Sequence, residues 1–128
     1  MRQLEIQAAI YDALQSMTPT VYDDVPDQSS GLTFPYIVIG DATSRDWSDD
    51  TYTGTDNTTT IHVWSRYPGY LEAKELMREI DARLNRVKLT VADASLLTCE
   101  LEYAEAMRDP DGETRHGVMR FRVVVTSA

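Results

Sequence analysis

The amino-acid sequence predicts an α+β fold, a single domain in which an antiparallel or mixed β-sheet is covered by two α-helices. Two segments carry apolar residues at the three- and four-residue spacing of a helix, and others carry the β-branched runs or the alternation of strands. The chain has 128 residues, the size of one domain. We therefore expect residues 1–128 to form one domain with the element order α-β-β-β-α-β-β.

The first predicted helix covers residues 2–17, because its apolar side chains form one stripe and Pro19 then ends it. Residues 21–22 are predicted to be briefly extended, and residues 27–33 to form a loop. Residues 34–40 begin with Phe-Pro-Tyr and continue as an unbroken apolar run, which indicates a strand covered on both faces. The predicted stripe of the helix consists of Ile6, Ile10, Ala13, Leu14 and Met17.

Residues 44–56 are predicted to be a long acidic loop, since they are too polar to pack and too numerous for a tight turn. Trp47 and Tyr52 lie in this segment among aspartates, and exposed aromatic side chains are enriched where proteins meet partners. We therefore take this loop as the candidate contact site. Its candidate contact residues are Asp46, Trp47, Asp49, Asp50 and Tyr52.

The second half of the sequence adds one helix and three strands. Residues 57–64 alternate as a β-branched strand, with His62 and Trp64 on one side. Residues 69–87 have the apolar spacing of a helix. Residues 97–103 and 119–125 alternate as two strands, and we expect Glu100 and Glu102 to lie across from Arg120 and Arg122. Asp109-Pro110-Asp111-Gly112 predicts the turn between them.

The charge of the chain is unevenly distributed. The net charge is −9, from 12 basic and 21 acidic residues, and most of the acidity lies in residues 1–64. Such a balance disfavours nucleic-acid binding by phosphate neutralisation. No apolar run reaches the roughly 20 residues of a membrane span, and Glu5 lies where a signal peptide would be basic and then apolar. We expect no membrane association and no export.

The sequence offers little catalytic chemistry. His62 and His116 lack a second ligand at metal-binding spacing, and Cys99 alternates with leucines as a small core residue. The Asp109–Gly112 segment lacks the downstream acids of a calcium loop. We therefore expect no catalytic residues, no cofactor, no metal and no enzymatic activity.

Several segments together resemble the tail terminator, or tail completion, proteins of long-tailed bacteriophages and prophages. The resemblance covers nearly the whole chain, and its most specific parts are a proline-ended acidic turn, a Phe-Pro-Tyr strand start and a Trp-Ser-Arg strand end. The matching segments are residues 4–14, Val21-Tyr22-Asp23-Asp24-Val25-Pro26, residues 34–40, Ile61-His62-Val63-Trp64-Ser65-Arg66, Glu72-Ala73-Lys74 and His116-Gly117-Val118-Met119-Arg120-Phe121.

This resemblance implies a structural virion protein that forms a ring, expected to be sixfold, at the head-proximal end of the tail. The ring would cap the finished tail tube and present a surface for head joining. Its partners would be further copies of itself, the major tail tube protein and a head-completion or neck protein. It would be assembled in the host bacterial cytoplasm, and genomic DNA would pass through the ring without specific binding.

Two other classes of protein remain open at this point. A different neck or minor tail component, such as a head-completion or stopper protein, shares the size, acidity and α+β composition of this chain. A cellular α+β binding module is the third possibility.

Overall fold

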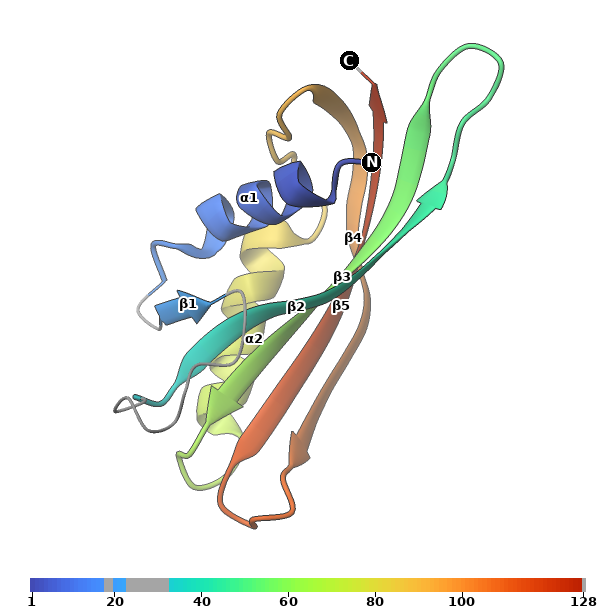
Figure 1. Cartoon of the computed structure of the whole chain (residues 1–128). Coiled ribbons are helices and arrows are strands. Elements are labelled where there is room, and N and C mark those ends of the chain that lie inside the picture. The colour runs from blue at the N-terminus through green and yellow to red at the C-terminus, as the bar shows by residue number, and fades with distance from the viewer. Residues whose placement is uncertain (18–19, 23–32, 128) are drawn as a thin grey trace.

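The computed structural model describes residues 1–17, 20–22 and 33–127. Its element order confirms the prediction of two helices and five strands, with the second helix between the third and fourth strands (Figure 1). The elements are α1 (Gln3–Leu14), β1 (Thr20–Tyr22), β2 (Tyr36–Asp46), β3 (Gly54–Ser65), α2 (Leu71–Leu84), β4 (Ala94–Arg108) and β5 (Arg115–Ser127).

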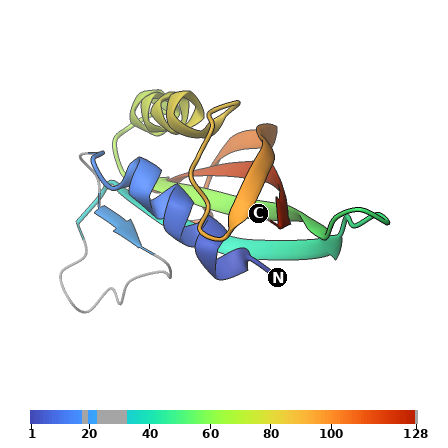
Figure 2. The same cartoon turned by 90° about the horizontal axis from the view of Figure 1, so that it is seen from above.

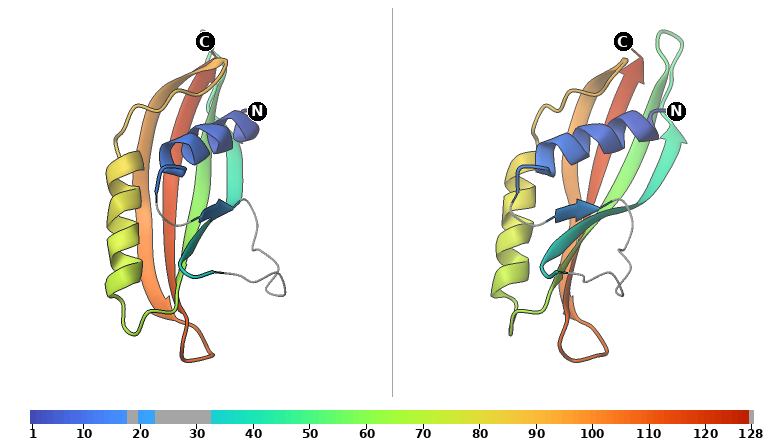
Figure 3. Two further views of the ribbon diagram at one scale, coloured as in Figure 1. Left: turned by 90° about the vertical axis from the view of Figure 1, so that its left-hand side faces the viewer. Right: turned by 60° about the vertical axis from the view of Figure 1, so that its left-hand side comes forward.

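The strands form one mixed sheet in the order β1-β2-β3-β5-β4. The short strand β1 is parallel to β2, and every other neighbouring pair is antiparallel. Both helices lie on the same face of the sheet (Figures 2 and 3), where α1 contacts β2 and α2 contacts β3, β4 and β5. Among the described residues, the opposite face of the sheet, which we call the outer face, carries no helix.

The core lies between the sheet and the two helices, and the predicted alternation accounts for it. Ile61 and Val63 of β3 are fully buried, while His62 and Trp64 point to the outer face and remain half-buried. Phe121 of β5 is the largest fully buried side chain. The helix stripe predicted from the sequence is also buried, except that Ala13 is only partly so.

Strand β4 differs from its prediction because it contains two β-bulges. The register shifts between Leu96 and Thr98 and again between Leu101 and Tyr103. The first bulge leaves Leu97 53% exposed, so the prediction that Leu97 faces the core is wrong. Each bulge adds one unpaired residue, which alternation alone does not show.

The bulges also change the expected charge pairing on the outer face. Glu100 lies opposite Arg122 as predicted, but Tyr103 and not Glu102 lies opposite Arg120. The guanidinium of Arg120 lies 5.6 Å from the centre of the Tyr103 ring, a cation–π contact. The prediction for Glu102 is therefore wrong by one residue.

The predicted acidic loop over residues 44–56 is also wrong in its boundaries. Strand β2 continues to Asp46 and β3 begins at Gly54, so that only residues 47–53 connect them. The hydroxyls of Thr43 and Thr58 are hydrogen-bonded across the two strands. Cross-strand polar pairs of this kind stabilise a hairpin without an apolar face. The long β2–β3 hairpin projects away from the helices (Figures 1 and 2).

Two other predictions concern short segments. The extended piece at residues 21–22 is confirmed as part of β1. The turn after Asp109 is confirmed: the Asp109 N–H donates to the carbonyl of Thr114, and Gly112 has a φ of +72°. The proline-ended acidic turn and most of the predicted loop at 27–33 lie outside the described residues.

Candidate interaction site at the hairpin tip

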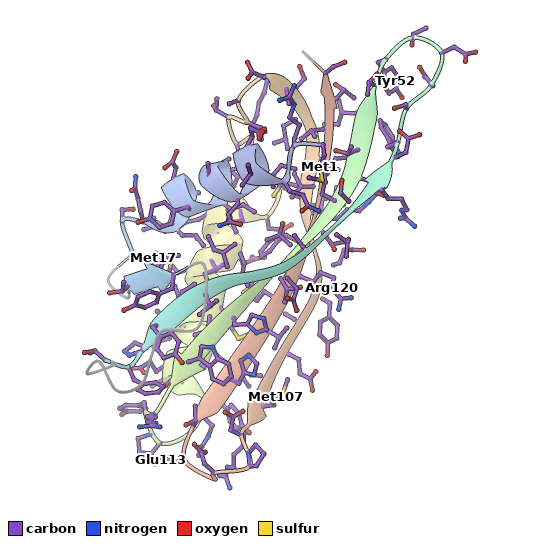
Figure 4. All side chains as sticks on the ribbon, in the orientation of Figure 1. Met1, Met17, Tyr52, Met107, Glu113 and Arg120 are labelled. Atoms are coloured by element: carbon purple, nitrogen blue, oxygen red, sulfur yellow. The ribbon has the colours of Figure 1, made fainter. Side chains whose placement is uncertain are left out.

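The tip of the β2–β3 hairpin, residues 46–54, presents two aromatic side chains. Trp47 is 37% exposed and Tyr52 is 36% exposed. Their ring centres lie 5.8 Å apart, so the rings pack on each other and not in the domain core. Figure 4 shows Tyr52 at the projecting end of the molecule. The hairpin therefore carries a small aromatic surface away from the rest of the fold.

Two of the candidate aspartates organise the turn itself. The Asp49 carboxylate accepts hydrogen bonds from the N–H (2.7 Å) and hydroxyl (2.8 Å) of Thr51. These bonds to the charged form lower the pKa of Asp49. Asp46 accepts a hydrogen bond of 2.7 Å from the Ser48 hydroxyl. Both carboxylates shape the loop, whereas Asp50 is simply exposed.

The base of the hairpin is held by a buried carboxylate. Asp56 is 7% exposed and accepts hydrogen bonds from Arg122 Nε at 3.0 Å and Nη2 at 2.9 Å. Arg45 donates to the same carboxylate at 3.3 Å. The hydrogen bonds from Arg122 are the main cause that lowers the pKa of Asp56. The sequence does not show this arrangement, because Asp56 lies in the predicted loop over residues 44–56 and Arg122 was expected to face only glutamates of β4.

A second polar cluster lies on the outer face. His62 Nδ1 is 2.7 Å from His116 Nε2, and the Trp64 ring stacks on His116 with a centre-to-centre distance of 3.7 Å. A Cβ at Gly40 would lie 2.9 Å from His62 Cδ2, so a glycine leaves room for that ring. The two histidines are 54 residues apart in sequence. Only the register of β3 with β5 brings them together, and sequence spacing could not show this.

Within residues 1–17, 20–22 and 33–127, no group of three or more histidine, cysteine or acidic side chains could hold a metal ion. Cys99 is buried, and burial raises its pKa to about 11, which disfavours the reactive thiolate. The helices in the described part of the chain are too short and too polar to span a bilayer.

The paired histidines predict a pH-dependent stability. Burial lowers the pKa of both imidazoles below 6.5, and His62 further lowers that of His116. The folded protein then binds fewer protons than the unfolded chain, so this stability is fully present above pH 6.5 and is lost as the pH falls through the lowered values. The urea concentration at the midpoint of unfolding should therefore decrease as the pH is lowered from about 7.5 to about 5.5. In the double variant His62→Asn/His116→Asn, the urea midpoint should depend less on pH. An equally steep pH dependence would show that the two histidines do not cause it.

These features describe a small α+β domain whose projecting hairpin displays an exposed aromatic pair. A family model described as Tail completion protein gp17 matches residues 5–126. The chain belongs to this family, whose members are structural proteins of phage tails and not enzymes. The resemblance found in the sequence is thereby confirmed.

Two similar proteins support the same conclusion. The tail completion protein gp17 of Bacillus phage SPP1 is 27% identical over 94 residues, which cover 73% of this chain and 69% of that protein. A chain in a solved structure titled "Virion of native gene transfer agent (GTA) particle" superposes with a TM-score of 0.85 at 26% identity, covering 95% of each chain. By its family the protein is therefore a structural protein of phage tails, and its fold is that of a chain found in a virion particle.

Proposed function

We propose that this protein forms a ring, expected to be hexameric, on the head-proximal end of the tail tube. The ring ends polymerisation of the major tail tube protein and presents the surface to which a head-completion or neck protein binds. Membership of the tail completion family and similarity to a chain of a virion particle support this proposal. The subunits would assemble in the cytoplasm of the host bacterium and remain in the virion.

The observation that carries the ring is the difference between the two edges of the sheet. One edge is the 15-residue strand β4. At the other edge the three residues of β1 pair only with residues 36–38, so among the described residues the rest of β2 has no strand beside it. Unlike edges pair head to tail, and such heterologous contacts close into a ring when the rotation between neighbours permits.

The acidity of the chain suits a ring through which DNA must move. A net charge of −9 per subunit repels phosphate, so the genome would slide through the channel without specific binding. The same charge opposes assembly, because neighbouring subunits repel one another until ions or a partner screen them.

This repulsion gives a direct test. The isolated protein should be monomeric at low concentration and low salt, and added salt or magnesium should shift it toward rings, since the Debye length is about 10 Å at 0.1 M. Light scattering over a salt series measures the shift. A monomer that is insensitive to salt and never joins tail tubes would contradict the ring.

The second candidate function is that of a neck or minor tail protein, which would occupy a different place on the tail. Membership of the tail completion family supports a tail location under either function, but a protein of this second kind would not bind at the head-proximal end of the tube. The place of binding on a purified tail therefore separates the two candidates.

A further inference from the structure

An open groove of about 410 Å³ lies along the outer edge of β4, beside the first of its two bulges. The segment that follows α2 forms one wall of the groove, because the N–H of Arg86 donates to the carbonyl of Cys99 at 2.7 Å. The bulge leaves Leu97 53% exposed in the lining. An apolar side chain held in solvent beside a concave surface is typical of a contact site.

The segment after α2 also adds two cations to this groove. Arg86 and Lys88 are both exposed and line it, and neither forms an ion pair with any of the described residues. Of the two acids closest in sequence, Asp93 does not line the groove and Glu100 lies across the strand pair from Arg122. The groove therefore combines an exposed leucine with an excess of positive charge.

The backbone of Arg86 supports a role for its side chain. Arg86 directly follows Asn85, the C-cap of α2, and has a φ of +60°, a conformation that glycine adopts more readily than any residue with a Cβ. Arginine is strained here where glycine is not, which indicates that its side chain serves a contact outside the subunit.

The tip of the β2–β3 hairpin, residues 46–54, has the complementary composition. It carries three aspartates and no basic residue. Trp47 and Tyr52 pack on each other there and are 37% and 36% exposed. Aromatic rings of this kind pack favourably on an apolar side chain and beneath a guanidinium or ammonium group. The tip therefore matches the groove both in charge and in apolar character.

The tip and the groove lie at the same end of the sheet but at opposite edges. Gly54 pairs with Thr126 of β5, and Thr126 pairs with Ser95 of β4, so the tip and the start of β4 lie at one level along the strands. Figure 1 shows the hairpin and β4 on opposite sides of the end of β5. Rotation about a ring axis that runs along the strands brings one edge to face the other without changing this level.

We propose that the hairpin tip of one copy docks in the groove beside β4 of a neighbouring copy, with the aromatic pair against Leu97 and the aspartates beside Arg86 and Lys88. The tip and the groove are different patches, so the contact is heterologous and suits ring closure. This inference rests on the proposed ring and identifies part of the interface between its subunits.

Reversing one charge separates this contact from the general repulsion between subunits. Asp50→Lys, at an exposed position, replaces one negative charge by one positive charge and changes the net charge from −9 to −7. Weaker general repulsion would strengthen association, whereas the proposed contact places the new lysine beside Arg86 and Lys88. We expect association about tenfold weaker than that of the unaltered protein, measured by analytical ultracentrifugation in salt that promotes assembly. Salt screens repulsion between whole subunits more than it screens a close, partly buried pair.

The matched control is Glu113→Lys, which makes the same change of charge at an exposed position in the β4–β5 turn, at the other end of the sheet (Figure 4). It should associate at least as well as the unaltered protein. Lys88→Glu should weaken association as Asp50→Lys does. A chain with both Asp50→Lys and Lys88→Glu should recover most of the association, since opposite charges again face each other.

Arg86→Gly distinguishes a contact from a role in the fold. Glycine adopts a φ of +60° without strain, so Tm should stay unchanged or rise, whereas loss of the guanidinium should weaken association. A lower Tm with unchanged association would show that Arg86 serves the fold and does not contact the tip.

The outcomes separate this contact from the ring itself. If Asp50→Lys associates as well as the unaltered protein or better, or if the double variant recovers nothing, the proposed docking is wrong and the ring stands. The docking is also wrong if Glu113→Lys weakens association as much as Asp50→Lys. If the unaltered protein itself never associates, in salt or on tail tubes, the ring is what fails.

Discussion

Replacing Trp47 and Tyr52 together by serine should abolish capping of tail tubes while leaving Tm nearly unchanged. The two rings pack on each other at the projecting tip and are 37% and 36% exposed, so their loss removes little of the domain core. Interface aromatics, in contrast, often carry much of the binding free energy. Thermal unfolding and electron microscopy of variant protein mixed with purified tubes measure the two effects.

The control for this double variant is Tyr67→Ser, which removes another exposed tyrosine (53%) outside the hairpin tip. Tyr67→Ser should change neither Tm nor capping appreciably. A large loss of thermal stability in the double variant together with normal capping would show that the two rings serve the subunit's own fold.

Asp56→Ala should destabilise the fold more strongly than substitutions of polar residues usually do. It removes two hydrogen bonds from Arg122 and one from Arg45 to a carboxylate that is 7% exposed. Hydrogen bonds to charged groups contribute about 1.5–3 kcal/mol, and part of that is recovered because both arginines can reach water. We expect a loss of about 2 kcal/mol in the free energy of unfolding, or roughly 8 °C in Tm, measured by urea and thermal unfolding.

The matched control is Arg45→Ala, because the Arg45 side chain is 82% exposed and makes one contact of 3.3 Å with Asp56. Its loss should cost about 0.5 kcal/mol or less. Since the pKa of Asp56 is lowered on folding, its contribution is present above pH 3.8 and is lost as the pH falls through the lowered value. Equal effects of the two substitutions would contradict the central role given to the Arg122 contact.

The sequence predicts the elements that bury apolar side chains. The stripe that includes Ile10 and Leu14 in α1 and the alternation of Ile61 and Val63 in β3 reflect burial on one face, which is a local property of the chain. The helix-covered sheet follows from these patterns. Bulges such as the one at Leu97 depend on how two strands pair, and no local pattern reports them.

The candidate site was predicted in part. The exposed aromatic pair Trp47 and Tyr52 follows from apolar side chains in a polar segment, although their contact role stays a prediction. The hairpin that displays them was missed, because its strands are stabilised by polar pairs such as Arg45 with Asp56 and not by an apolar face. The His62–His116 contact required knowledge of the register between β3 and β5.

Electron microscopy of the protein mixed with purified tail tubes is the decisive measurement for the proposed ring. We expect a ring of identical subunits on one end of each tube, the end that joins the head, and tubes that no longer elongate when tail tube protein is added. Density at the opposite tip or along the tube, or no binding at all, would contradict the proposed function.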